Sequence, residues 1–232
     1  MDGWSNTRAP LLCAGLFAVA IACAAPDANT AVEPERPPPA PYLDLALAAE
    51  RYIASTLIDT ESGIAWPDFA EDPESIALSL YHGTPGILLF YLELAEVTGE
   101  DGYRDLAIAG GDDLLARLEG LEEASANLYS GLAGTAFVLG ELARVSGHSR
   151  FRDTARATFQ RIRDQATPVG SGLAWIEPMP FSEIHGHTGM KEVVDVSRGA
   201  AGIGLALLYA AEHELHEDAL EWALAVGNRL LV

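Results

Sequence analysis

The stretch Ser79-Leu-Tyr-His-Gly83-Thr-Pro-Gly86, which is followed by the apolar run ILLFYL, contains a pattern that the chain uses three times. Its G-x-x-G pair returns at Gly131-Leu-Ala-Gly134 and at Gly199-Ala-Ala-Gly202. Each pair precedes an apolar run and then a more polar run. Self-similarity at a spacing on the order of 50 residues indicates a repeat protein, in which each unit buries its apolar face against its neighbours.

The runs between the glycine pairs predict two kinds of helix. Nearly continuous apolar character predicts inner helices that are buried on most sides, at 86–97, 134–145 and 202–211. Amphipathic spacing predicts outer, half-solvated helices at 104–118, 151–163 and 219–232, and a further helix at 42–58. Paired inner and outer helices form hairpins. We therefore expect an all-α fold, an α/α toroid of helical hairpins that forms a partial ring of about three and a half hairpins.

A second repeated segment occurs in two loops of the predicted repeat. Ser62-Gly-Ile-Ala-Trp66 returns as Ser171-Gly-Leu-Ala-Trp175, in each case between an amphipathic run and the next G-x-x-G pair. A buried indole mostly serves packing. We expect each tryptophan to cap the helix layer beneath it.

The first 25 residues do not belong to the fold. Arg8 precedes an apolar stretch at 11–25, which is typical of a signal peptide. Within it, Val19-Ala-Ile-Ala-Cys23 resembles a bacterial lipoprotein box, although Ala20 stands where such boxes usually have leucine. We expect export to the bacterial cell envelope with lipid attached at Cys23. Ordinary signal-peptidase cleavage at an A-x-A site, which would give a periplasmic protein, is the alternative.

A proline-rich linker at 26–41 leads to the toroid domain at 42–232. The formal net charge of −20 argues against a nucleic-acid partner, because no basic stripe is present to neutralise phosphates. Both cysteines, Cys13 and Cys23, lie in the leader. We therefore predict no metal site and no cofactor in this chain. His185-Gly-His187 near Glu183 offers metal-binding side chains, but its loop setting favours an unliganded segment.

The last predicted helix has apolar side chains around its circumference, among them Leu220, Trp222 and Leu224. If Trp222 stayed in water, the fold would lose roughly 4–6 kcal/mol of the stabilisation that burial of its indole provides. We therefore expect a partner, or further hairpins of a longer protein, to cover this helix.

The repeats resemble those of the lanthionine synthetase C-like (LanC-like) family. The residues that carry the resemblance are Ser79–Gly86 with the run after it, Tyr129–Gly134 and Val196–Ile203. The resemblance covers 42–232, roughly the first half of the family's seven-hairpin toroid. It implies a cavity zinc ion and a cyclase that adds a peptide cysteine to a dehydrated serine or threonine, which forms a thioether ring. The family's zinc ligands are two cysteines and a histidine, with a Cys-His-Gly motif that this chain lacks.

The resemblance also suggests catalytic residues. The family places an acid/base histidine immediately before a repeat glycine and an aspartate four residues before another. His82 stands directly before Gly83, and Asp195 stands four residues before Gly199. Arg198 occupies the histidine's equivalent place before Gly199, and Asn127 stands where a carboxylate would be expected. His82 would suit proton transfer at neutral pH, and Arg198 could hold an anionic group of the substrate. The alternative for each is structural: a locally bonded histidine, a helix cap and an ion pair.

Three functions remain open at this point. The chain can be an envelope-tethered LanC-like cyclase that needs a zinc-bearing second half, or a non-catalytic scaffold that binds peptides. A carbohydrate-active α/α toroid is the weakest choice, because that chemistry needs two carboxylates in the cavity and only Asp195 is a candidate.

Overall fold

The computed structural model describes residues 39–69, 71–178 and 190–231. The chain divides into two units, 1–43 and 44–232, and the fold lies in the second. Seven helices account for most of the described residues, which confirms the predicted all-α class. The helix α2 (Pro39–Ser55) comes first and is followed by three helical hairpins. They are α3 (Thr84–Thr98) with α4 (Asp101–Glu119), α5 (Leu132–Ser146) with α6 (Ser149–Asp164), and α8 (Ala200–Glu212) with α9 (Ala219–Leu230).

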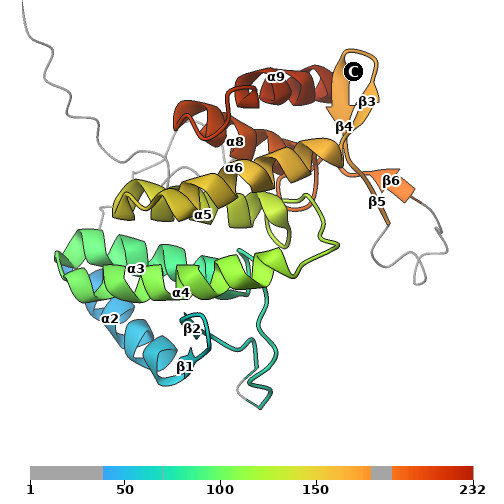
Figure 1. Cartoon of the computed structure of the whole chain (residues 1–232). Helices are drawn as coiled ribbons and strands as arrows, with labels where there is room; N and C mark the ends of the chain where they lie inside the picture. The colour runs from blue at the N-terminus through green and yellow to red at the C-terminus, as the bar shows by residue number, and fades with distance from the viewer. Residues whose placement is uncertain (1–38, 70, 179–189, 232) are drawn as a thin grey trace, which may run out of the picture. The chain divides into compact units, whose positions relative to one another are not determined.

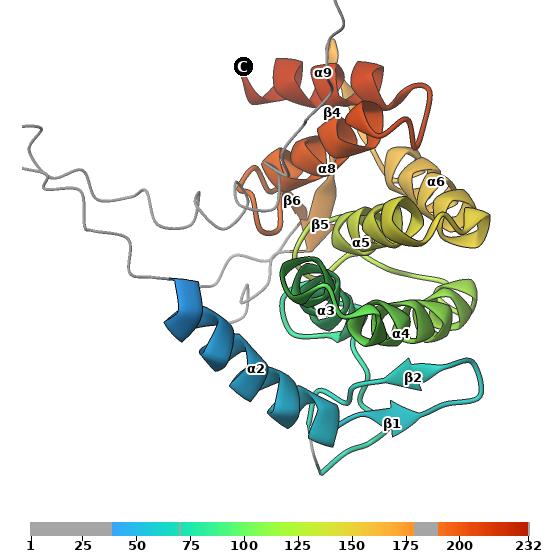
Figure 2. The same ribbon diagram turned by 90° about the vertical axis from the view of Figure 1, so that its left-hand side faces the viewer.

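The hairpins stack in chain order, as Figure 1 and Figure 2 show. The first helices of successive hairpins touch one another, α3 with α5 and α5 with α8. These are the predicted inner helices. The middle one, α5, is buried over every residue from Leu132 to Ala143 because it has an inner helix on either side. This arrangement is that of an α/α toroid, and the described hairpins form part of its ring.

The G-x-x-G pairs are explained by how each inner helix begins. The loop before the helix folds back, and the first helical amide donates to a carbonyl seven residues earlier: Thr84 to Ala77, Leu132 to Ser125, and Ala200 to Val193, at 3.1, 2.8 and 2.8 Å. The N-cap residue of each of these helices is a glycine, so no side chain caps the helix. Backbone from the loop satisfies amides that a helix N-terminus leaves without an intrahelical partner.

This backbone cap leaves no room for a side chain at either glycine. A Cβ on Gly131 would lie 2.2 Å from the Ser125 carbonyl oxygen, and one on Gly134 would lie 2.1 Å from that of Leu128. The other two pairs are equally close to carbonyls of their own loops. The crowding at the glycine pairs therefore arises mainly between each helix and its own loop.

Three short antiparallel ribbons were missed by the sequence analysis. They pair β1 (Ile58–Asp59) with β2 (Ile64–Ala65), β3 (Thr167–Val169) with β4 (Gly172–Ala174), and β5 (Ile176–Pro178) with β6 (Met190–Glu192). The first two contain the repeated Ser-Gly-x-Ala-Trp segments, and each packs on the following outer helix, β2 on α4 and β4 on α9.

The two repeated tryptophans occupy equivalent positions. Trp66 and Trp175 are buried, and each indole Nε1 donates to the carbonyl of the residue thirteen positions earlier: Ile53 at 3.1 Å and Ile162 at 2.9 Å. Each indole thus ties its ribbon to the helix that precedes it in the chain, and its ring is buried. The predicted packing role of both tryptophans is confirmed.

A buried polar cluster joins α5 to α8. The Tyr209 hydroxyl donates to Glu141 Oε1 at 2.6 Å, and Arg144 donates to the same carboxylate at 2.7 Å. Glu141 is only 6% exposed, so the carboxylate depends on these two donors. Hydrogen bonding to Glu141 raises the pKa of the Arg144 guanidinium above its ordinary value, against an opposing effect of burial.

The last hairpin departs from one expectation. Trp222 is buried at 8% exposure, with its ring 4.2 Å from that of His216, so its burial does not require the covering partner for which we argued from this residue. Leucines on both helices of the hairpin are exposed instead: Leu205, Leu208, Leu220 and Leu224. The expectation that something covers this hairpin stays a prediction. Of the helices described, none is long and apolar enough to cross a membrane.

Candidate functional site

The loops before α3, α5 and α8 are joined in series by one repeated hydrogen bond. The Tyr81 amide donates to the Tyr129 carbonyl at 3.0 Å, and the Tyr129 amide donates to the Ser197 carbonyl at 3.0 Å. These three residues hold the same position in their repeats, two before the first glycine. The bonds therefore align the loops in register. Tyr81 stacks on Tyr129, with ring centroids 5.9 Å apart.

The residue four positions before each first glycine closes the turn of its loop. Ser79, Asn127 and Asp195 each accept a hydrogen bond from the amide three residues later. For Asn127 and Asp195 this bond is 2.8 Å long. Short polar side chains are favoured here because they bond to nearby backbone. The middle position therefore needs an acceptor oxygen and not a charge, which explains why Asn127 serves as well as a carboxylate.

Asp195 is exposed, and its hydrogen bonds stay within its own loop. Its Oδ1 accepts from the Arg198 amide and from the Ser197 hydroxyl, both at 2.8 Å. Partial burial acts to raise the pKa of Asp195, but these donors and the Arg198 charge together lower it below its ordinary value. Asp195 is thus held as a carboxylate that caps the turn before α8.

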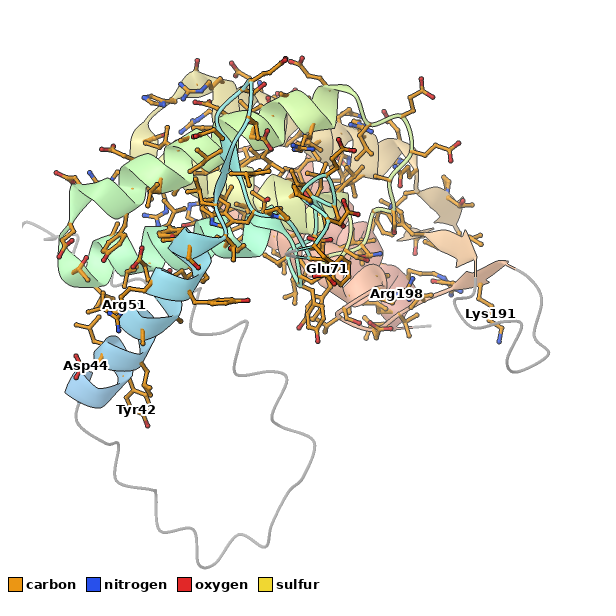
Figure 3. The ribbon with its side chains drawn as sticks, turned by 90° about the horizontal axis from the view of Figure 1, so that it is seen from below. Tyr42, Asp44, Arg51, Glu71, Lys191 and Arg198 are labelled. Carbon is orange, nitrogen blue, oxygen red and sulfur yellow. The ribbon has the colours of Figure 1, made fainter. Side chains whose placement is uncertain are left out.

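Arg198 lies on the same loop and is labelled in Figure 3, which views the protein from below. Its backbone amide makes the described bond to Asp195. No hydrogen bond or ion pair in the described part of the chain joins His82 to Asp195 or to Arg198. The catalytic roles suggested for these three residues remain predictions.

His82 ends the first loop, directly before the N-cap glycine of α3. Its Nδ1 lies 3.0 Å from the hydroxyl oxygen of Ser79, and its ring meets that of Tyr81 edge-on. Ser79 is buried and also donates to the Tyr129 carbonyl at 2.9 Å. The buried serine therefore ties the imidazole to the second loop, while His82 as a whole residue is exposed.

His82 lines a cleft of about 590 Å³ between the first two loops and the end of α4, which we call the loop cleft. Its apolar wall consists of Ile76, Leu78, Leu118, Leu121 and Leu132. Its polar side chains are Ser79, His82, Arg117, Glu123, Ser125, Ser130 and Thr135. An open cleft that combines apolar surface with a few polar groups is the usual form of a ligand site.

One wall of the loop cleft is fixed by an ion pair. Asp113 is 3% exposed, and its carboxylate accepts from Arg117 Nε at 2.5 Å. Because an unpaired buried carboxylate is costly, Arg117 is held in place on the cleft wall. Residue spacing did not single out Ser79, Arg117 or Asp113 in the sequence. The position of Ser79 four before a glycine was the one available signal.

A model of the family described as lanthionine synthetase C-like protein matches residues 74–231. This span includes all three G-x-x-G pairs and the loop cleft. The chain belongs to the LanC-like family. No curated protein matches the sequence.

The LanC-like resemblance implies a zinc site, which needs several donor side chains close together. Within residues 39–69, 71–178 and 190–231, no three or more His, Cys, Asp or Glu side chains form a group that could hold a metal ion. The described donor set does not fit a zinc ion. Cys23 and the His185-Gly-His187 segment lie outside the described residues.

Proposed function

We propose that this LanC-like chain binds a peptide in the loop cleft, with His82 as the group that exchanges a proton with it. The observation that carries the proposal is that the loop cleft is walled by two register-aligned repeat loops and has His82 on its rim. Leucine and isoleucine on one wall suit an apolar side chain, while Arg117 and Glu123 suit the polar backbone of a peptide.

The chemistry related to this family is thiol addition to a dehydroamino acid. A carbon–sulfur bond forms at the β-carbon, the thiol proton leaves to a base, and the resulting enolate takes a proton at the α-carbon. A histidine beside the peptide can serve in either proton transfer. We propose peptide binding as this chain's own contribution, because the described donors do not supply a zinc site to activate the thiol.

A matched pair of tryptophan substitutions tests the binding site. Ala116 is exposed on α4 and lines the loop cleft, whereas Ala157 is exposed on α6 outside it. The probe is a short fluorescent peptide with one cysteine and one dehydroalanine, and fluorescence anisotropy measures its binding. We expect Ala116→Trp to weaken binding at least about tenfold and Ala157→Trp to leave it unchanged. Equal affinities for both variants would refute the loop cleft as the site.

The same peptide separates an enzyme from a scaffold. Cyclisation consumes the free thiol without changing the peptide's mass, so alkylation of remaining thiols reports turnover. A peptide that binds but keeps its thiol supports a scaffold, whereas thiol loss that depends on His82 supports a cyclase.

We also propose export to the cell envelope, with lipid attached at Cys23. Support comes from the sequence alone: a basic residue, an apolar stretch and a small residue before Cys23. Metabolic labelling with a radioactive fatty acid should mark the natural chain and not the Cys23→Ser variant.

A further inference from the structure

The contacts of the Ser79 hydroxyl determine where its proton lies. Ser79 Oγ is 2.9 Å from the carbonyl oxygen of Tyr129, which is a hydrogen-bonding distance for two oxygen atoms. A carbonyl oxygen has no proton to give, so the proton between these atoms belongs to Ser79. Ser79 is 3% exposed, and this leaves its hydroxyl dependent on protein partners.

The same hydroxyl then has only lone pairs to offer His82. Ser79 Oγ is 3.0 Å from His82 Nδ1, and a serine has a single hydroxyl proton. Because that proton lies on the Tyr129 carbonyl, the proton of the Ser79–His82 bond must come from Nδ1. The Tyr81 and His82 amides lie farther from this oxygen, at 3.2 and 3.4 Å, and share its second lone pair.

We propose that Ser79 is a positioning residue that fixes neutral His82 as its Nδ1–H tautomer. In this tautomer Nε2 has an unshared electron pair and can only accept a proton or a hydrogen bond. His82 lines the loop cleft, so Nε2 is the acceptor available to a ligand there. The ligand that fits is one that presents an S–H, O–H or N–H donor.

This inference deepens the proposed peptide function, on which it rests for the source of the donor. In a peptide that carries a cysteine, the donor is the thiol. The Ser79 bond to Tyr129 has a further consequence, because it connects the first loop to the second across the cleft. A ligand that moves the second loop would loosen the bond that sets the His82 tautomer.

The tautomer can be measured directly in the full chain without any peptide. Long-range ¹⁵N–¹H correlation spectra of histidine rings distinguish a protonated ring nitrogen from one with a free electron pair. The spectra are recorded at a pH at which imidazoles are neutral, and His82→Gln assigns the signals. We expect His82 to show a protonated Nδ1 and an unprotonated Nε2. A protonated Nε2 in the natural chain would overturn the proposal.

Substitutions at Ser79 test its role. Ser79→Ala should lower the ratio of Nδ1–H to Nε2–H by about fivefold, the factor that corresponds to one ordinary hydrogen bond. Ser79→Thr keeps the hydroxyl and should retain the natural ratio. Ser130→Ala is the matched control, since Ser130 also lines the loop cleft but bonds to Asn127. An unchanged ratio in a folded Ser79→Ala variant would contradict the positioning role.

The tautomer spectra do not depend on peptide binding, so the two experiments can fail independently. If the tautomer is as expected but the peptide does not bind, the proposed function fails and the positioning role survives. If Ser79→Ala does not fold, the spectrum of the natural chain and that of Ser79→Thr still decide the proposal.

Discussion

Substitution of Gly131 by alanine tests the explanation of the repeat most sharply. The new Cβ would lie 2.2 Å from the Ser125 carbonyl oxygen and 2.8 Å from the Asn127 amide nitrogen. Both are backbone atoms, so no side-chain rotation relieves the clash. The loop must move, and its movement breaks the 2.8 Å bond from the Leu132 amide to Ser125. Overpacking costs about 1–3 kcal/mol and a lost hydrogen bond about 0.5–1.5 kcal/mol, so we expect a loss of about 2–4 kcal/mol.

The control for this substitution is Gly102→Ala. Gly102 lies in the first turn of α4, and a Cβ there meets nothing within 4 Å. Alanine should leave stability unchanged or raise it by about 0.4–1 kcal/mol, because it restricts the unfolded chain. Urea unfolding followed by far-ultraviolet circular dichroism measures both free energies, and the thermal midpoint of Gly131→Ala should fall by roughly 4–16 °C. Equal stability of the two variants would refute the backbone-cap explanation of the glycine pairs.

Three further predictions concern buried groups. Trp175→Ala should lower the free energy of unfolding by about 3–5 kcal/mol. Trp175→Phe should lower it less, because most of the ring volume is kept and the bond to Ile162 is lost. Equal losses in urea unfolding would show that the indole bond, and not packing, dominates. A double-mutant cycle of Glu141→Ala and Tyr209→Phe, which removes the acceptor and the donor in turn, should give a coupling energy of about 1.5–3 kcal/mol, the usual value for a hydrogen bond to a charged group. Additive effects would argue against the described bond. Burial, with the Glu50 charge nearby, raises the pKa of Tyr91 from its ordinary 10.0 to about 12. The neutral phenol is therefore favoured in the folded state, so its contribution is complete below pH 10 and is lost as the pH rises towards 12. The urea midpoint of the natural chain should fall more steeply than that of Tyr91→Phe over this range, and parallel curves would contradict the shift.

The sequence predicted the helices well because their signals are local. Apolar runs after each glycine pair give α3, α5 and α8 directly, and the glycines at 99 and 147 end α3 and α5 in the left-handed conformation that glycine favours. The ribbons were missed because two- or three-residue strands are too short to show alternation. Their repeated tryptophans were nevertheless recognised as packing residues.

The candidate site was harder to predict, because it depends on contacts between repeats. The bond from Ser79 to Tyr129 spans 50 residues, and no spacing rule connects a serine to a distant carbonyl. The burial of Trp222 within its own hairpin was not predicted, because its helix is apolar all round and periodicity does not show which side meets His216. His82 was predicted because it stands next to a repeat glycine. The loop cleft beside it was not, because residues from two separate loops and α4 form it.

Peptide binding in the loop cleft is tested most directly by a crystal structure of the full chain with the peptide that carries one cysteine and one dehydroalanine. We predict peptide density in the loop cleft, with a donor of the peptide within hydrogen-bond distance of His82 Nε2 and the Ser79 bond to Tyr129 retained. Peptide bound on another face, with the loop cleft empty, would contradict it.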